Sequence, residues 1–224
     1  LRKNKLADIG ILPSAYARMA DLSPEQNAAI INRAVSRYRD EFGEAPVFFA
    51  YPYGEYSTTI KKQIAGYAFD AAFGQQSGVA HKGSDFLALP RFIMTDDYGD
   101  LDRFLLTADA LPLPVSDVIP DDTVIGQNPP MIGFTVTSEI SDLSKLSCFV
   151  SGQGKTPLSR LGDNRIEIRL TAPFDDRRTR VNCTMPDDTV IPGQPQSGRG
   201  FSMLLIAGDF SDDSTDDSDS TDNQ

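Results

Sequence analysis

The 224-residue sequence contains no tryptophan, one histidine and two cysteines, and all of its apolar runs are short. None approaches the roughly 20 apolar residues that span a bilayer, so no transmembrane segment is predicted. Basic residues number 21 against 32 acidic ones, which disfavours a nucleic-acid partner. The sequence opens at Leu1 without a signal-peptide pattern, and we therefore expect it to be part of a longer precursor.

Most of the negative charge lies at the C-terminal end. Seven aspartates between Asp209 and Asp222 occur there without a lysine or arginine, and without them the net charge of −11 would be −4. A Ser/Asp/Thr segment of low complexity cannot bury apolar surface. We therefore predict a disordered acidic tail over residues 209–224, with calcium binding or solubilisation as the alternative to a bare solvated tail.

The first 110 residues alternate between strand and helix patterns. Ser23, Pro24 and Gln26 form a capping box with proline in the first turn, and Gly43 is typical of a helix end. The predicted strands are 6–10, 46–51, 68–73 and 86–94, and the predicted helices are 24–42, 57–65 and 101–107, the last capped by Asp100. Such alternation indicates parallel strands with right-handed crossovers. Four strands are too few for a closed barrel, so we predict an α/β fold that is part of a (β/α) barrel over residues 1–110.

The pattern changes after a proline-rich stretch at residues 111–127, which we interpret as a linker. Short strand patterns without any helix follow, and the alternation in Ile166-Glu-Ile-Arg-Leu170 is the clearest. The predicted strands are 131–136, 146–151, 165–170, 178–184 and 201–206. They predict an antiparallel, all-β sandwich of immunoglobulin-like type over residues 128–208.

Both cysteines, Cys148 and Cys183, lie in strand-like segments of the second half. We expect a disulfide across the sandwich, and two buried thiols are the alternative. A disulfide would indicate an oxidising compartment such as the periplasm or the cell surface.

The most informative motif is Tyr51-Pro52-Tyr53-Gly54, which ends the apolar run 46–50. The backbone must leave the strand at the proline and glycine and expose its amides before the next helix begins. Reactive sites of α/β proteins lie at such strand ends. The alternative is a turn packed by two aromatic rings, without function.

Residues Phe49–Tyr56, FAYPYGEY, resemble the third motif of the polysaccharide deacetylase family, the NodB-type carbohydrate esterases. The order of the surrounding parts is also similar, with Asp8-Ile-Gly10 upstream and Gly66–Phe73 and Leu89-Pro-Arg-Phe92 downstream. The resemblance covers roughly residues 6–110, the C-terminal part of the catalytic domain. The second half more weakly resembles the β domain of some bacterial members.

This resemblance implies a distorted (β/α) barrel that removes N-acetyl or O-acetyl groups from polysaccharides. A divalent metal, usually zinc, would polarise the carbonyl and activate water, and a backbone N–H of the third motif would stabilise the oxyanion. Carried over, that donor is the amide of Tyr53, in a turn fixed by Pro52. Tyr51, Pro52 and Tyr56 become candidates for substrate binding, with buried packing of the tyrosines as the alternative. Arg91 is a candidate for orienting an acidic partner at the barrel mouth.

The residues that would hold the metal do not match the family pattern. Its second motif, H-S/T-x-x-H, corresponds to Leu12-Pro-Ser-Ala-Tyr16, so Leu12 and Tyr16 replace both histidines, and leucine cannot ligate zinc. The first motif would lie upstream of Leu1. His81 lies in a Gly/Ser loop away from the motifs, so the general-acid histidine has no counterpart. We predict no metal and no cofactor in this chain, because of missing upstream sequence or loss in the lineage.

Three hypotheses follow. The first is a fragment or degenerate member of the polysaccharide deacetylase family, outside the cytoplasm, with an acetylated polysaccharide as partner and without metal-dependent turnover. The second is a noncatalytic module for glycan binding or cell-envelope interaction. The third is a β-sandwich adhesin joined to an unrelated α/β domain.

Overall fold

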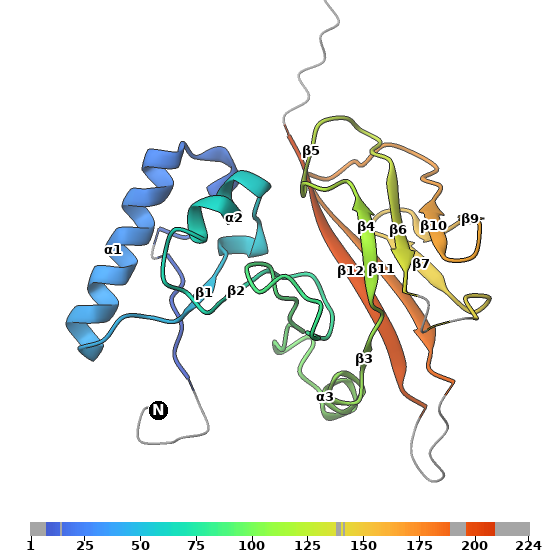
Figure 1. Ribbon diagram of the computed structural model, residues 1–224, viewed down its shortest axis with the longest axis horizontal. Coiled ribbons are helices and arrows are strands. Elements are labelled where there is room, and N and C mark those ends of the chain that lie inside the picture. The colour runs from blue at the N-terminus through green and yellow to red at the C-terminus, as the bar shows by residue number, and fades with distance from the viewer. Residues whose placement is uncertain (1–7, 14, 138–139, 141, 189–195, 209–224) are drawn as a thin grey trace, which may run out of the picture.

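The computed structural model describes residues 8–13, 15–137, 140, 142–188 and 196–208, and Figure 1 shows two parts lying side by side. The predicted acidic tail, 209–224, is outside the described residues. The helical elements are η1 (Met19–Asp21), α1 (Pro24–Phe42), η2 (Pro52–Gly54), α2 (Thr58–Ile64) and α3 (Leu101–Ala108). The strands are β1 (Phe48–Ala50), β2 (Ala71–Phe73), β3 (Leu111–Pro112), β4 (Val115–Ile119), β5 (Val124–Ile125), β6 (Ile132–Val136), β7 (Ser147–Val150), β8 (Gly154–Thr156), β9 (Leu158–Leu161), β10 (Arg165–Ile168), β11 (Arg178–Pro186) and β12 (Gly198–Ala207).

Helix α1 confirms the start and stop signals of the sequence. The side chain of Ser23 accepts a hydrogen bond from the Gln26 amide, and the Gln26 side chain accepts one from the Ser23 amide. At the other end, Gly43 adopts a left-handed conformation with φ of 73°. Both signals are local, so they are independent of tertiary contacts. The cap of α3 is confirmed likewise, because Asp100 accepts a hydrogen bond from the Arg103 amide at 2.8 Å.

A small parallel sheet lies inside the first half. Strands β1 and β2 pair in parallel, Ile11 bridges to Phe49 on one side of β1, and Leu89 bridges to Phe73 on the outer side of β2. Four chain segments therefore lie in sequence order with a common direction. No closed barrel forms among the described residues, whose first half is a mixed α/β arrangement. None of the described helices has the length and apolar character of a membrane span.

The predicted strand at 86–94 was wrong, because only Leu89 makes a ladder contact there. The Asp85 side chain accepts a hydrogen bond from the Leu87 amide at 2.9 Å, and its carbonyl accepts one from Ala88. Such local bonds compete with a β-ladder. Pro90, which has no N–H to donate, follows immediately.

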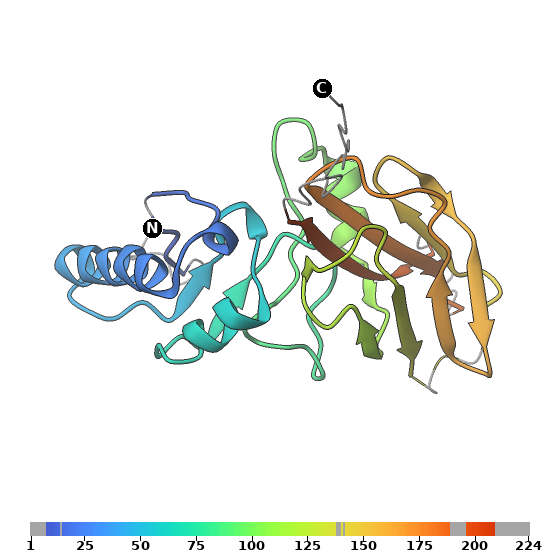
Figure 2. The ribbon, with the colours of Figure 1, turned by 90° about the horizontal axis from the view of Figure 1, so that it is seen from above.

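Helix α1 lies on the outer side of the first half, away from the two larger sheets (Figures 1 and 2). Its apolar face covers the parallel sheet, and α2 covers the same core. One apolar cluster joins these elements. The strand ends near residues 11, 50 and 73 are therefore held in place by packed side chains of the helices and the sheet. The buried members from these elements are Ile11, Ile31, Ala34, Tyr38, Phe49, Ile60, Ile64 and Ala72.

Two sheets pack around one core in the second half. The four-stranded sheet has the order β4-β6-β10-β9, with antiparallel neighbours throughout. The other sheet has the order β3-β12-β11-β7-β8, with β5 also pairing β12; β3 and β5 run parallel to β12, and the other pairs are antiparallel. The core of the second half is formed by side chains from both sheets, which include Ile132, Phe134, Val136, Ile166, Ile168, Val181, Met203 and Leu205.

The proline-rich stretch 111–127, interpreted above as a linker, contributes β3, β4 and β5 to these sheets. Leu113 and Ile125 are buried in the sandwich core. Proline is compatible with short edge pairing, and β3 makes only a two-residue ladder with β12. The second half therefore begins near Leu111 as a folded unit.

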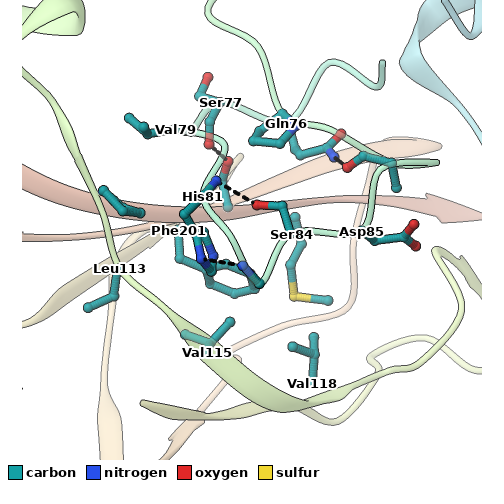
Figure 3. A pocket seen from close by; sticks show the side chains of 18 of the residues that line it. Gln76, Ser77, Val79, His81, Ser84, Asp85, Leu113, Val115, Val118 and Phe201 are labelled. Atoms are coloured by element: carbon teal, nitrogen blue, oxygen red, sulfur yellow. Dashed lines mark hydrogen bonds between the residues drawn. The ribbon is translucent and has the colours of Figure 1, made fainter. Parts of the chain in front are cut away.

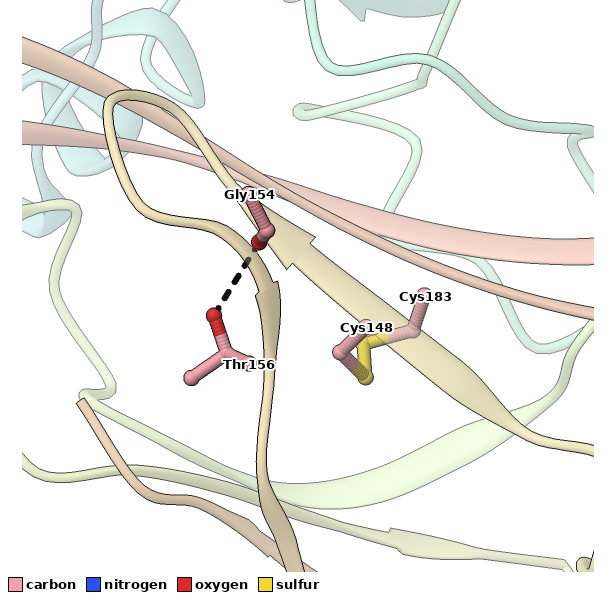
Figure 4. The surroundings of a disulfide bond; sticks show 4 residues. All are labelled: Cys148, Gly154, Thr156 and Cys183. Atoms are coloured by element: carbon pink, nitrogen blue, oxygen red, sulfur yellow. Dashed lines mark hydrogen bonds between the residues drawn. A yellow bond between two sulfur atoms is a disulfide. The ribbon is translucent and has the colours of Figure 1, made fainter. Parts of the chain in front are cut away.

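Cys148 and Cys183 form a disulfide, but it lies within one sheet rather than across the sandwich (Figure 4). The two residues are direct neighbours on β7 and β11, with Cα atoms 4.0 Å apart. Both are fully buried, and the residue that pairs with Cys148 on its other side is Thr156 of β8. The bond therefore ties the centre of the larger sheet.

Reduction of this disulfide should lower the free energy of unfolding by roughly 4 kcal/mol, because it releases a loop of 35 residues in the unfolded chain. Urea titrations of oxidised and reduced protein measure the difference. A Cys148→Ala/Cys183→Ala variant serves as the control and should not respond to reductant. Coincident midpoints for oxidised and reduced wild type would contradict the prediction.

Candidate functional site

The motif at the end of β1 forms a tight turn, η2, with an unusual backbone. Tyr53 has φ of 56° and ψ of 2°, and Gly54 has φ of 70°. Left-handed backbone suits glycine but costs about 1–3 kcal/mol at a bulky residue, which persists only where the surroundings fix it. A Cβ at Gly54 would stand 2.4 Å from the Gln75 side chain, so glycine is required there.

Two of the amides after Pro52 close the turn. Gly54 N–H donates to the Tyr51 carbonyl at 2.9 Å, and Glu55 N–H donates to the Pro52 carbonyl at 3.1 Å. The Tyr53 amide has no hydrogen-bond acceptor among the described residues. Tyr53 does not line the cavity described below, and its role as an oxyanion donor stays a prediction.

The segment that corresponds in position to the second motif comes to the same place. Ile11 forms a parallel bridge with Phe49, so residues 12, 13, 15 and 16 and the turn 51–54 follow neighbouring parallel segments at the same end. The ring centroids of Tyr16 and Tyr53 are 4.4 Å apart. Tyr16 also has a positive φ of 41°, and it is 43% exposed. We call residues 12, 13, 15 and 16, together with the turn 51–54, the strand-end mouth.

A buried carboxylate stands directly behind this mouth. Glu55 has no exposed surface, and its Oε1 accepts a hydrogen bond from Arg18 Nη1 and lies 3.2 Å from Arg178 Nε. Arg18 comes from the loop before η1, whereas Arg178 comes from β11 of the second half. Two guanidinium groups from distant parts of the chain therefore share one carboxylate oxygen, as buried charge requires.

Arg178 also holds the strained turn directly. Its Nη2 donates to the Tyr53 carbonyl at 2.6 Å and to Gln75 Oε1 at 3.3 Å. Burial lowers the pKa of Arg178, and the Glu55 carboxylate opposes that shift. The Arg18 guanidinium lies 4.7 Å from the centroid of the Tyr53 ring, a cation–π distance. Sequence reasoning missed Arg18, Glu55 and Arg178 as a group, since no local spacing connects them.

Two tyrosines proposed for substrate binding are placed differently. Tyr51 has no exposed surface and donates a hydrogen bond to the Leu87 carbonyl at 2.8 Å, as in the buried-packing alternative. Burial, with further contributions from Tyr56 and Asp85, raises its pKa well above the usual range. Tyr56 is half-buried, packs 5.1 Å from the Tyr51 ring, and lines a cavity between the two halves. Burial, Asp85 and Asp122 raise its pKa as well. Pro52 is buried.

The Arg91 side chain is bonded to the segment that follows β2. Its Nε donates to the Gly74 carbonyl at 2.7 Å, and its amide donates to the Gln76 carbonyl at 3.0 Å. These bonds fix the course of the loop 74–90 against itself. No acidic partner of Arg91 is found among the described residues, and an orienting role for it stays a prediction.

The loop 74–90 and the second half enclose a cavity of about 300 Å³ (Figure 3). His81 lies on its wall, away from the strand-end mouth. The side chains that Figure 3 labels are Gln76, Ser77, Val79, His81, Ser84 and Asp85 from the loop, and Leu113, Val115, Val118 and Phe201 from the sheets. Tyr56 connects this cavity to the motif turn.

Zinc, which the family resemblance implies, does not fit the described residues. Leu12 and Tyr16 stand at the mouth where the pattern requires histidines, and leucine offers no ligand atom. No group of three or more His, Cys, Asp or Glu side chains suited to a metal occurs in the described part of the chain. We therefore derive no chemical step through a metal.

No protein-family model matches the chain, and a search of curated proteins found no match.

Replacing Glu55 by glutamine should lower the free energy of unfolding by about 3–5 kcal/mol, because two guanidinium groups would lose their buried counterion. Urea denaturation measures this. The matched control is Glu167→Gln, whose partner Arg169 is exposed and whose loss should cost at most about 1 kcal/mol. Equal effects of the two substitutions would show that the Glu55 cluster is not a stabilising link.

Proposed function

We propose that this chain is a protein of the polysaccharide deacetylase type that binds an acetylated polysaccharide at the strand-end mouth, without metal-dependent turnover. One observation carries the proposal: Tyr16 and Tyr53 meet at the ends of neighbouring parallel strands, with ring centroids 4.4 Å apart. The first segment lies where the family's second motif would fall in the chain order, although both histidines are replaced, and the second segment resembles the third motif. The two thus form one surface.

The proposed fold is a partial NodB-type barrel followed by an immunoglobulin-like sandwich. The common direction of Ile11, β1, β2 and Leu89 supports the first part, since successive parallel segments are how such a barrel is built. Two packed sheets with mainly antiparallel pairing support the second. The disulfide is consistent with a location outside the cytoplasm, in the periplasm or the cell envelope.

Binding rather than turnover is favoured by the side chains at the mouth. Tyr16 and Leu12 are 43% and 45% exposed, so an aromatic and an aliphatic surface face solvent where metal ligands would stand. An exposed tyrosine ring offers a flat apolar face beside a hydroxyl, which suits a sugar ring. This observation also supports the second candidate, a noncatalytic glycan-binding module of the cell envelope.

Titration calorimetry with N-acetylated chitooligosaccharides should show binding that weakens about fivefold in Tyr16→Ala, corresponding to about 1 kcal/mol for one aromatic contact. Tyr98→Ala removes an exposed tyrosine elsewhere and is the control. An unchanged affinity in Tyr16→Ala would refute binding at the mouth.

A separate assay measures acetate release from the same oligosaccharides with added zinc. We expect no release above a no-protein control, because Leu12 provides no ligand atom. Zinc-dependent release would overturn the noncatalytic part of the proposal.

A further inference from the structure

The cavity between the two halves is lined by both polar and apolar side chains. The loop 74–90 contributes polar groups, including His81, Ser84 and Asp85, whereas β4 and β12 contribute Val115, Val118 and Phe201 (Figure 3). At about 300 Å³ it is at the lower limit for small-molecule sites, which often lie between domains. A ligand that fits must be small, with one apolar face and one polar edge.

Hydrogen bonds between the halves fix these walls in place. Thr123 Oγ1 donates to the Tyr56 carbonyl, and Ser202 Oγ donates to the Ser77 carbonyl. All four of these residues line the cavity. Nearby, both carboxylate oxygens of Asp122 accept from the Thr58 amide at 3.2 Å, at the start of α2. A cavity whose two walls are bonded to each other is preorganised, which reduces the ordering cost of binding.

His81 is held as a hydrogen-bond donor toward the cavity. Its Nδ1 accepts a hydrogen bond from the Gly83 amide at 3.2 Å, and its own amide donates to Ser84 Oγ at 2.9 Å. A neutral imidazole whose Nδ1 is an acceptor carries its proton on Nε2. The loop therefore provides an N–H donor beside the Ser84 hydroxyl, both suited to a hydroxylated ligand.

The charges around the cavity disfavour an anion. Lys61 is paired with Asp85, with Nζ and Oδ2 2.8 Å apart, and Asp121 also lines the cavity. One lysine and two aspartates line the cavity, so their charges leave one negative charge in excess. Carboxylates accept hydrogen bonds from hydroxyl groups, whereas they repel a ligand carboxylate.

We propose that this cavity binds a single uncharged sugar ring, with its C–H face against Phe201 and Val118 and its hydroxyl edge toward His81, Ser84 and Asp85. This inference rests on the proposed function, since it assigns a second glycan subsite behind the strand-end mouth. Tyr56 lines the cavity and packs against Tyr51 of the motif, so the two subsites share one wall.

The chain offers a single reporter for this cavity, because His81 is its one histidine. The imidazole Hε1 proton therefore gives one NMR signal, which can be followed at fixed pH without assignment. N-acetylglucosamine should shift this signal saturably in the wild-type chain, and glucuronate at equal concentration should not. Absence of a shift with N-acetylglucosamine, or an equal shift with glucuronate, would overturn the proposal.

A cavity-filling variant tests the position of the ligand. Val118→Phe adds bulk inside the cavity and should reduce the affinity for N-acetylglucosamine at least tenfold. Leu161→Phe makes a comparable change at an exposed position on β9 and should leave the affinity unchanged. Circular dichroism checks that both variants fold, and His81→Gln, followed by calorimetry, replaces Val118→Phe if that variant does not. An unchanged affinity in the folded cavity variant would contradict the proposal.

Failure here and failure of the proposed function give different results. If oligosaccharides bind, Tyr16→Ala weakens that binding and the His81 signal does not shift, then binding at the mouth is supported and the cavity subsite is refuted. If the His81 signal shifts but Tyr16→Ala does not change the affinity for oligosaccharides, then the cavity subsite is supported and binding at the mouth is refuted.

Discussion

The carboxylate of Glu55 lies out of contact with solvent and is flanked by two arginines from opposite halves of the chain. A buried charge is tolerated only with close partners, so Arg18 and Arg178 have little freedom to move away. Arg178 belongs to β11, and through it the sandwich is fixed against the motif turn. Arg177 beside it pairs with Asp21 of η1, which adds a second link of the same kind.

This ion cluster also accounts for the backbone of the turn. A tyrosine at φ of 56° is unfavourable by about 1–3 kcal/mol unless its surroundings fix it. Here Arg178 donates hydrogen bonds to the Tyr53 carbonyl and to Gln75, and Gln75 packs closely on Gly54. The turn is thus held by the second half, and the direction of the Tyr53 amide depends on contacts far away in sequence.

Local signals made much of the fold predictable. Three predictions that depend on only a few neighbouring residues were confirmed. They are the helix start at Ser23, the helix cap at Asp100 and the strand around Ile166. The strand expected at 86–94 failed because Asp85 forms a local turn instead. Residues 111–127 contain too little alternation to indicate β3–β5. Strands β8 and β9 were also missed, since their partners β7 and β10 rather than their own composition specify them.

The candidate site likewise has one part that depends on neighbouring residues and one that depends on contacts between distant residues. The motif turn could be found from sequence because its residues are contiguous, whereas the Glu55 cluster and the cavity combine segments more than 100 residues apart. Such contacts depend on how the halves meet. The shape of the proposed glycan surface therefore derives from the ion cluster and from hydrogen bonds between the halves, and none of these requires a metal. At the strand-end mouth, Leu12 and Tyr16 offer an aliphatic and an aromatic side chain to a ligand, which is why we propose recognition rather than turnover.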